Sequence, residues 1–273
     1  MPRPALAATR ALAVLDFLAA HPTDEFTLSD LAGELDINVA SAHAVLGVLT
    51  EEGYLVRNPR LRTYSLGPSV VALGSGALER HPAIDHARDE ARRLSEELDL
   101  GVAVTALAGD DIVFLARVGE HQAHEIQVHV GQRIPLVPPI GAVFVAWLDP
   151  EPWLSRASDR VAMEALLDDV RARGWAVAME TDAHRARRGS LAEPITDLDP
   201  SEYVGPLAGD RTYDVVMIAA PVFDRRGDSL VSITLLGLES GLTADQVAEY
   251  GERVRDAGLV ATRRSGGRAP AAR

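Results

Sequence analysis

The chain has 273 residues with 27 basic and 40 acidic side chains, no cysteine and no lysine. With 47% hydrophobic and 25% charged residues it has the composition of a globular protein, and the missing cysteines exclude disulfide scaffolds, thiolate metal sites and cysteine nucleophiles. The net charge of −13 argues, taken globally, against nucleic acid as a partner. The longest uncharged apolar run, 134–148, is too short to span a bilayer, and Asp16 interrupts the N-terminal apolar stretch. We therefore expect a cytoplasmic protein without a membrane partner.

The first 67 residues predict a small helical domain with a hairpin. Helices are expected over 9–20, 27–35 and 38–53. Thr9, Thr27 and Asn38 are suitable N-caps, and Thr27 with Asp30 forms a variant of the capping box. Two helices joined by a short turn have the spacing of a helix-turn-helix. Two short strands, 54–57 and 63–66, then predict a wing around Asn58-Pro59.

A linker helix over 68–81 is expected next, and a larger domain follows it. Its helices are expected over 82–98, 141–148, 159–173 and 243–264, and its strands over 102–107, 112–118, 126–130, 214–223 and 230–237. Hairpin strands mixed with helices indicate an α+β domain around an antiparallel sheet. The segment 181–212 shows no periodicity and predicts a long loop, and the Gly-, Pro- and Arg-rich tail 265–273 predicts disorder.

Six short motifs, in this order, resemble the IclR family of bacterial transcriptional regulators. They are Arg10-Ala-Leu-Ala-Val-Leu, Thr27-Leu-Ser-Asp-Leu-Ala, Ser41-Ala-His-Ala-Val-Leu, Gly53-Tyr54-Leu, Tyr64-Ser-Leu-Gly67 and Ile218-Ala-Ala-Pro221-Val-Phe. The resemblance implies a winged helix-turn-helix over 1–67, a linker helix over 68–81 and a GAF-like effector-binding domain over 82–264. It also implies a double-stranded DNA operator as partner and a homodimer or dimer of dimers as the working form.

The local charge can be reconciled with DNA binding. Residues 1–76 have five arginines and eight acidic side chains, a net charge of −3, and the acidic side chains lie mostly on the helices. Arg57, Arg60 and Arg62 cluster at the wing, where arginines can contact phosphates. The alternative for this cluster is a solvated hairpin tip, but the adjacent helix-turn-helix favours DNA.

The third helix departs from the family pattern, which usually has a basic residue at Val39, a hydroxyl at Ala40 and an arginine at Ala44. Small apolar side chains cannot make bidentate contacts to base edges, although alanine can touch a thymine methyl. We therefore expect weak direct readout, with sequence preference from Ser41, His43, thymine methyls and DNA shape. His43 is equally compatible with half-buried packing. The DNA-contact candidates are Arg10, Thr27, Ser29, Val39, Ala40, Ser41, His43, Ala44, Arg57, Arg60, Arg62 and Tyr64.

The resemblance places an effector pocket around the loop before the helix at 141–148. This loop lacks the polar residue and the lysine usual in the family, and Met217 replaces the usual cysteine. An apolar or aromatic effector is therefore favoured, although backbone N–H groups at the helix start and Thr234 could still bind a small carboxylate. The alternative is that these residues only fill the core. The effector-contact candidates are Val104, Val137, Gly141, Ala142, Met217 and Thr234.

Two further patterns are set aside. Gly227-Asp228-Ser229-Leu230 matches an esterase signature, but no histidine base follows the serine, so we expect no enzyme. A histidine-rich group could reach one zinc or nickel ion if its loop folds back, but surface histidines are favoured, so no cofactor or metal is expected. Its members are His121, His124, Glu125 and His129.

The expected function is a sequence-specific DNA-binding transcriptional regulator, of repressor type, whose operator binding is modulated by a small organic effector. Two-fold assembly would let paired recognition helices meet half-sites one or more helical turns apart. The alternative is a family member that has lost specific DNA recognition and acts as an oligomeric small-molecule sensor or protein-interaction module.

Overall fold

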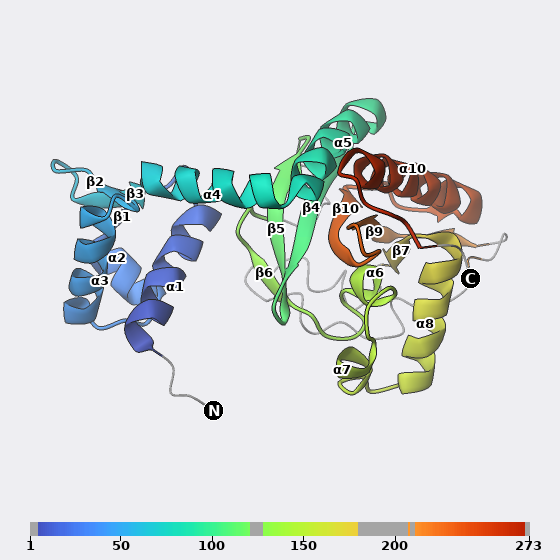
Figure 1. Cartoon of the computed structure of the whole chain (residues 1–273), viewed down its shortest axis with the longest axis horizontal. Helices are drawn as coiled ribbons and strands as arrows, with labels where there is room; N and C mark the ends of the chain where they lie inside the picture. Colours follow the sequence, from blue (N-terminus) through green and yellow to red (C-terminus); the bar gives the residue numbers. More distant parts are fainter. Residues whose placement is uncertain (1–4, 121–127, 180–206, 208–210, 271–273) are drawn as a thin grey trace. The chain divides into compact units, whose positions relative to one another are not determined.

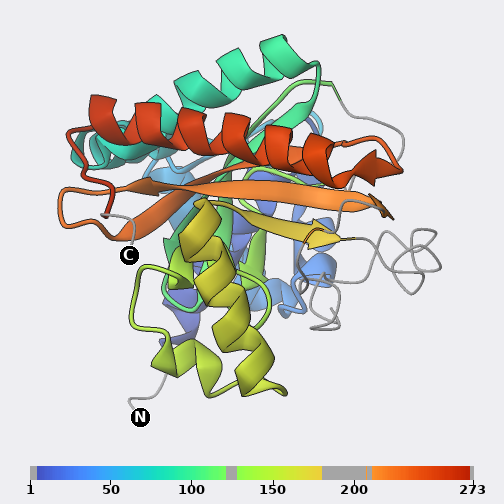
Figure 2. The same cartoon turned by 90° about the vertical axis from the view of Figure 1, so that its right-hand side faces the viewer.

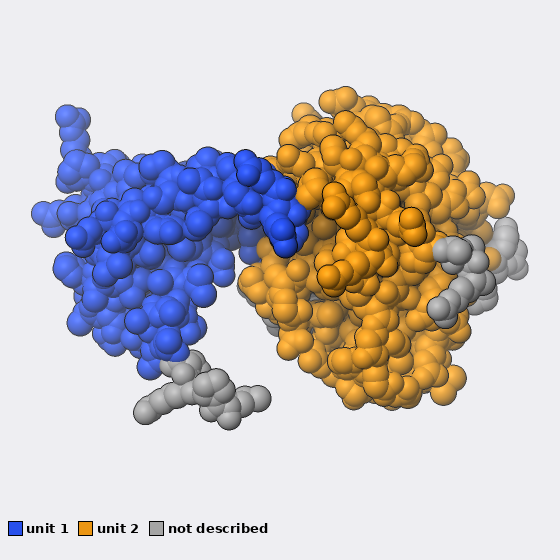
Figure 3. All heavy atoms as spheres, in the orientation of Figure 1, with its two compact units in different colours: residues 1–81, 129–132 blue, residues 82–128, 133–273 orange. Residues whose placement is uncertain are grey.

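The computed structural model describes residues 5–120, 128–179, 207 and 211–270 (Figure 1). The chain divides into two compact units, one of residues 1–81 with 129–132 and the other of residues 82–128 with 133–273 (Figure 3). Among the described helices, none combines the length and the apolar character that a bilayer span requires. Each unit has its own sheet and its own core.

The first unit packs three helices against a small antiparallel sheet with the strand order β1-β3-β2. The helices are α1 (Leu6–Ala20), α2 (Leu28–Glu34) and α3 (Val39–Glu51), and the strands are β1 (Phe26–Thr27), β2 (Leu55–Arg57) and β3 (Thr63–Leu66). Leu46 of α3 and Leu31 of α2 lie at the centre of the core, with β2 and β3 closing it through Leu55 and Tyr64. The predicted helix-turn-helix and wing are therefore confirmed.

Helix α1 differs from its prediction at its start, and Leu12, one of the apolar residues whose helical spacing predicts a buried stripe with Leu15 and Ala19, is exposed. It begins at Leu6 rather than at Thr9, because the alanines before Thr9 favour a helix more strongly than a threonine favours a cap. The residues that α1 buries are Val14 and Leu18, whereas Leu12 is 61% exposed.

The start of α2 is fixed by the predicted capping box. The Thr27 N–H donates to Asp30 Oδ2 at 2.8 Å, and the Asp30 N–H donates to Thr27 Oγ1 at 3.3 Å. The backbone hydrogen bond from Thr27, with a second from its hydroxyl, lowers the pKa of the Asp30 carboxyl. Asn38 caps α3 in the same manner, accepting from the Ser41 N–H at 2.9 Å.

This capping box should make part of the stability of the first unit depend on pH. The pKa of Asp30 is lower in the folded chain than in the unfolded chain, so the ionised carboxylate stabilises the fold at any pH above the ordinary aspartate pKa of about 3.9. This stabilisation is lost as the pH falls through the lowered pKa of the folded chain. Urea unfolding of the full chain should show Asp30→Asn less stable than wild type at pH 6, with the difference shrinking at pH 3. A difference that stays constant with pH would contradict this.

Helix α4 (Pro68–Arg80) is the predicted linker helix, and it buries none of its residues. Its start is held to the wing domain by hydrogen bonds from the Gly67 N–H to the Tyr54 carbonyl at 2.7 Å, from the Ser69 N–H to the Gly53 carbonyl at 3.2 Å and from the Ser69 hydroxyl to the Glu52 carbonyl at 3.0 Å. The large apolar side chains of Val71 and Leu73 are exposed on it.

The second unit is built on a six-stranded antiparallel sheet with the order β6-β5-β4-β10-β9-β7. In this order the strands are Arg133–Pro135, Asp111–Val118, Gly101–Ala108, Ser229–Leu236, Val215–Phe223 and Ala176–Met179. One face is covered by α5 (Pro82–Leu98) and α10 (Ala244–Arg264), and the other by α6 (Ala142–Val145), α7 (Glu151–Leu154) and α8 (Arg160–Arg173) (Figure 2). A two-stranded sheet joins β8 (Thr212–Tyr213) to β11 (Leu242–Thr243).

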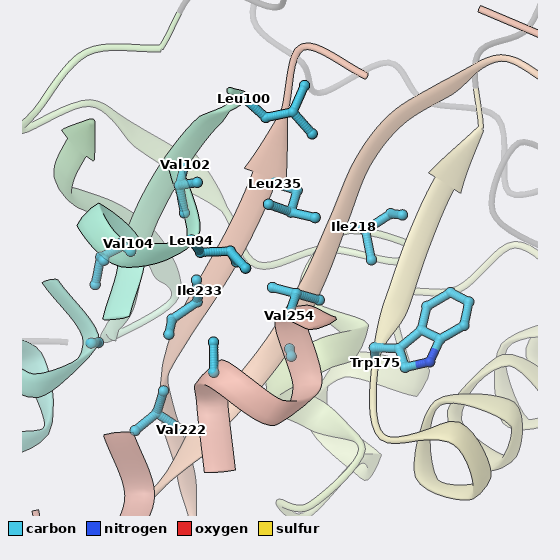
Figure 4. Close-up of a cluster of buried hydrophobic side chains, with 14 of the residues drawn as sticks. Leu94, Leu100, Val102, Val104, Trp175, Ile218, Val222, Ile233, Leu235 and Val254 are labelled. Atoms are coloured by element: carbon cyan, nitrogen blue, oxygen red, sulfur yellow. The ribbon is translucent and has the colours of Figure 1, made fainter. Parts of the chain in front are cut away.

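The main core lies between the sheet and the pair α5 and α10 (Figure 4). Its side chains include Leu94 and Val254 from the helices and Val102, Ile218 and Ile233 from the strands. Because side chains alternate between the two faces of a strand, the intervening residues face α6 and α8. The predicted hairpins and the helices at 82–98, 159–173 and 243–264 are confirmed.

Several elements of the second unit differ from prediction. Residues 128–130 of the strand expected at 126–130 are not a strand, and 126–127 lie outside the described residues. A turn closed by the Gln132 N–H and the His129 carbonyl intervenes, and pairing with β5 begins only at β6. Helix α6 is shorter than expected, and β7 and α7 were not predicted. Nearly all of the loop expected at 181–212 lies outside the described residues.

The tail expected to be disordered is ordered over 265–270. The Gly267 N–H donates to the Thr262 carbonyl at 2.8 Å, and the Arg268 N–H donates to the Asp224 carbonyl at 2.9 Å. Composition alone predicts disorder here, but the Asp224 carbonyl in the β9–β10 turn accepts a hydrogen bond from the backbone of the tail.

Candidate nucleic-acid interface and ligand cavity

Helix α3 presents a mostly uncharged surface to solvent. Its exposed residues are Val39, Ala40, His43, Ala44, Gly47, Val48 and, at its C-terminal end, the charged Glu51. Its buried side is formed by Ala42, Leu46 and Leu49. His43 is exposed, which removes the half-buried packing role considered for it. Of the predicted contact residues on α3, those with a hydrogen-bonding side chain are the exposed His43 and the partly exposed Ser41.

Arg10 of α1 holds Ser41 in place. The Arg10 Nη1 donates to Ser41 Oγ at 3.1 Å, which joins two predicted DNA-contact residues that are 31 positions apart. A guanidinium has five N–H donors, so Arg10 retains donors for a phosphate while it orients the serine hydroxyl.

The wing is shaped by Asn58. Its side-chain oxygen accepts from the Arg60 N–H at 3.0 Å, and its carbonyl accepts from the Arg62 N–H at 2.8 Å. Arg57, Arg60 and Arg62 are all exposed, and none forms an ion pair with a carboxylate of the described chain. Arg57 lies over the Tyr64 ring, 6.0 Å from its centroid. The wing thus offers three unneutralised guanidinium groups.

Three other predicted contact residues lie in different surroundings. Tyr64 is only 8% exposed and belongs to the core of the first unit, so its prediction as a surface contact is wrong. Thr27 uses its hydroxyl in the capping box. Ser29 is exposed at the start of α2.

A small cavity of about 70 Å³ lies in the second unit, on the sheet face opposite α5 and α10. Four of the predicted effector residues line it: Gly141, Ala142, Met217 and Thr234. The remaining wall is largely apolar, with Ile112 and Phe114 from β5 and Ala176 and Ala178 from β7. None of the lining side chains is charged.

Val104 and Val137, the other two predicted effector residues, do not line this cavity. Val104 is fully buried on the opposite face of the sheet, among the side chains that meet α5 and α10 (Figure 4). The neighbouring residue Thr105 lines the cavity instead. The prediction is therefore wrong by one position on β4, and one position reverses the face of a strand.

The cavity contains a row of three buried hydroxyl groups. Thr105 Oγ1 and Ser232 Oγ are 2.8 Å apart across the β4–β10 pair, and Ser232 Oγ is 3.5 Å from Thr234 Oγ1. Thr105 and Ser232 were not among the predicted residues, although Ser232 lies two positions from Thr234 and therefore on the same face. Hydroxyls donate and accept, so the row can bind a neutral polar group. It offers no counter-charge to a carboxylate.

The structure also shows the surroundings of the described residues in the two sequence patterns that were set aside. Ser229 is fully buried, and its hydroxyl donates to the Val143 carbonyl at 3.2 Å, a packing contact. Three members of the histidine-rich group, 121, 124 and 125, lie outside the described residues, and the described part of the chain contains no cluster of three metal-ligating side chains.

Comparison with known proteins gives a consistent picture. The model of the IclR helix-turn-helix domain matches residues 7–59. The glycerol operon regulatory protein of Streptomyces griseus is 30% identical over 69% of this chain and 78% of its own length. The crystal structure of an IclR transcriptional regulator from Alicyclobacillus acidocaldarius has a TM-score of 0.69 at 21% identity, covering 97% of this chain and all of that one. An IclR homologue from Microbacterium hydrocarbonoxydans, complexed with 4-hydroxybenzoate, has a TM-score of 0.63 at 18% identity, covering 95% and 98%.

Proposed function

Because the chain belongs to the IclR family of transcriptional regulators, which are not enzymes, we propose that it acts in the cytoplasm as a homodimer or dimer of dimers on a two-fold symmetric operator. Pairing two winged helix-turn-helix domains matches half-sites spaced by whole helical turns. The main supporting observation is the wing, where three exposed arginines without carboxylate partners among the described residues accompany a helix-turn-helix whose recognition helix exposes only one charged side chain, Glu51 at its C-terminal end.

We assign different roles in DNA binding to the side chains of the wing and of the recognition helix. The wing arginines and Arg10 bind phosphates and set the position of the protein on the duplex. Ser41, held by Arg10, and His43 contact base edges, while Val39, Ala40 and Ala44 contact thymine methyls. Most of the sequence preference then comes from DNA shape.

The proposed effector is a small neutral molecule with one hydrogen-bonding group and an apolar body. The cavity's hydroxyl row, formed by Thr105, Ser232 and Thr234, supports the polar contact. Burying a carboxylate without a counter-charge costs several kcal/mol, which disfavours an acid here. The cavity is about half the roughly 150 Å³ that holds a benzene ring, so a ring would require the flexible Met217 to shift.

A thermal-shift experiment with phenol and benzoate at millimolar concentration tests this. Phenol should raise the melting temperature of the wild type, and Thr234→Val should weaken phenol binding by about tenfold, because it removes one hydroxyl of a buried row. Thr212→Val, at an exposed strand position, is the matched control and should bind like wild type. A neutral effector in this cavity would be refuted if phenol raised the melting temperature of Thr234→Val as much as that of the wild type. It would also be refuted if benzoate raised the melting temperature of the wild type but not that of Thr234→Val.

A further inference from the structure

The second unit contains a groove of about 900 Å³ that is separate from the effector cavity. Its walls come from the end of α8, the middle of α10, the end of β9, the segment that follows α6 and the tail residues Ala269 and Pro270. The volume lies within the range of about 300 to 1,000 Å³ that is usual for small-molecule sites. Unlike the effector cavity, this groove has charged side chains in its wall.

Three arginines line the groove, Arg171, Arg173 and Arg255, against a single acidic lining residue, Asp168. Arg171 pairs with Asp168 at 2.7 Å, and Arg255 pairs with its neighbour Asp256 at 3.0 Å. Two of the three arginines are thus neutralised by a carboxylate, and Arg173 is the groove arginine that has no ion pair with a described carboxylate. A guanidinium without such a partner can attract an anion.

Arg173 is the cation without a direct counter-charge. Its Nε donates to the Trp175 carbonyl at 2.9 Å, and its guanidinium lies 4.4 Å from the Trp175 ring centroid. No carboxylate of the described residues lies within ion-pair distance of it. Burial, only partly offset by the more distant Asp169, lowers the pKa of Arg173. Its remaining N–H groups are free to bind an anion in a fixed orientation.

The position of Arg255 in the groove depends on Gly174, the C-cap of α8. Gly174 has a φ of +83°, and a Cβ placed on it would lie 2.9 Å from Cδ of Arg255. The missing side chain lets Arg255 of α10 lie across the end of α8. Arg173 of α8 and Arg255 of α10, which are distant in sequence, thereby both line the groove.

The apolar part of the groove is aromatic. The rings of Trp147 and Phe223 are in edge-to-face contact with centroids 5.2 Å apart, and both residues line the groove. Leu148, Pro221 and Leu259 extend this surface. Charged and apolar walls together match a ligand with an anionic head and a ring.

We propose that this groove binds a small aromatic carboxylate, with the carboxylate on Arg173 and Arg255 and the ring against Trp147 and Phe223. This site is distinct from the proposed effector cavity and takes the class of ligand that the cavity disfavours. The two sites are connected through α6, because its residues Ala142 to Phe144 line the cavity and the residues just after its end, Ala146 to Leu148, line the groove.

Calorimetric titration of the full chain with 1-naphthoate tests the proposal, since this two-ring acid exceeds the effector cavity but fits the groove. The neutral analogue 1-naphthalenemethanol should bind at least about tenfold more weakly, because it lacks the charge-assisted hydrogen bonds. Arg173→Gln should weaken 1-naphthoate binding by about tenfold or more, and Arg173→Lys should retain part of the affinity.

Controls separate this site from the other proposals. Arg255→Gln is the second test variant, should Arg173→Gln disturb the fold, and it should also weaken binding. Arg263→Gln removes an exposed charge on α10 outside the groove and should have no effect, as should Thr234→Val in the effector cavity. The proposal would be overturned if 1-naphthoate and 1-naphthalenemethanol bound with equal affinity, or if both arginine variants bound 1-naphthoate with the affinity of the wild type. A change in oligomeric state in Arg173→Gln, with no naphthoate binding to wild type, would overturn it in favour of an interface between copies of the chain.

Discussion

Replacing Arg57, Arg60 and Arg62 together by alanine should lower operator affinity about a hundredfold or more and should flatten the dependence of affinity on salt. Each phosphate contact contributes about 0.9 to the slope of log K against log salt, so loss of three contacts should reduce the slope by about 2.7 per protomer. The prediction rests on the exposure of all three guanidinium groups and on the absence of carboxylate partners for them within the described chain. Fluorescence anisotropy with upstream DNA at several salt concentrations measures both quantities.

The fold of the wing should survive this triple substitution. The hairpin is organised by Asn58, whose side chain and carbonyl accept backbone N–H groups that alanine at 60 and 62 retains. Arg62 has a φ of +59°, and alanine replaces one L-residue by another there, so the backbone strain is unchanged.

The matched control removes the same charge elsewhere. Arg225, Arg226 and Arg263 are exposed in the second unit, and their replacement by alanine changes the net charge equally. This control should leave the salt slope near that of wild type. Unchanged affinity in the wing variant would contradict the phosphate role of the wing. If wild type itself shows only nonspecific binding, the alternative function, a sensor that has lost operator recognition, is favoured.

The sequence predicted most features that depend on neighbouring residues, although the expected Thr9 cap was wrong because α1 begins at Leu6. The Thr27–Asp30 capping box, the Asn38 and Thr243 caps and the two hairpins follow from contacts within a few positions. Strand β7 and β6 escaped prediction because each is a short segment whose strand conformation depends on pairing with a distant strand, β9 and β5 respectively. The intrinsic strand propensity of a few residues does not indicate whether they will pair with a distant strand.

Prediction of the candidate sites was limited in the same way, because it also depends on contacts between residues distant in sequence. Thr234 was predicted, and period-two alternation alone could have added Ser232, but Thr105 required the register between β4 and β10. The error at Val104 arose because a pattern match fixes a strand but not which of its faces meets the ligand. The groove could not be predicted from the sequence, since Arg173 and Arg255 come to line it only through the packing of α10 against the end of α8 at Gly174.

Substitution of Gly251 by alanine should destabilise the second unit by about 3 kcal/mol. A Cβ at this buried position of α10 would lie 2.2 Å from Cε2 of Trp175, which is itself only 3% exposed and packs within the main core (Figure 4). A flat ring enclosed on both sides cannot yield by that amount without displacing its neighbours, and overpacking of this kind costs about 1 to 3 kcal/mol or more. Urea unfolding followed by tryptophan fluorescence gives the change in the free energy of unfolding.

The same substitution in an open helical position should have the opposite sign. No atom lies within 4 Å of a Cβ built at Gly47 of α3, so Gly47→Ala should stabilise the first unit by up to about 1 kcal/mol through helix propensity alone. Gly251→Ala combined with Trp175→Leu separates steric conflict from any other effect of alanine, because the smaller side chain vacates the space that the Cβ needs. The double variant should be more stable than the sum of the two single effects predicts, and simple additivity would refute a direct contact between these residues as the cause.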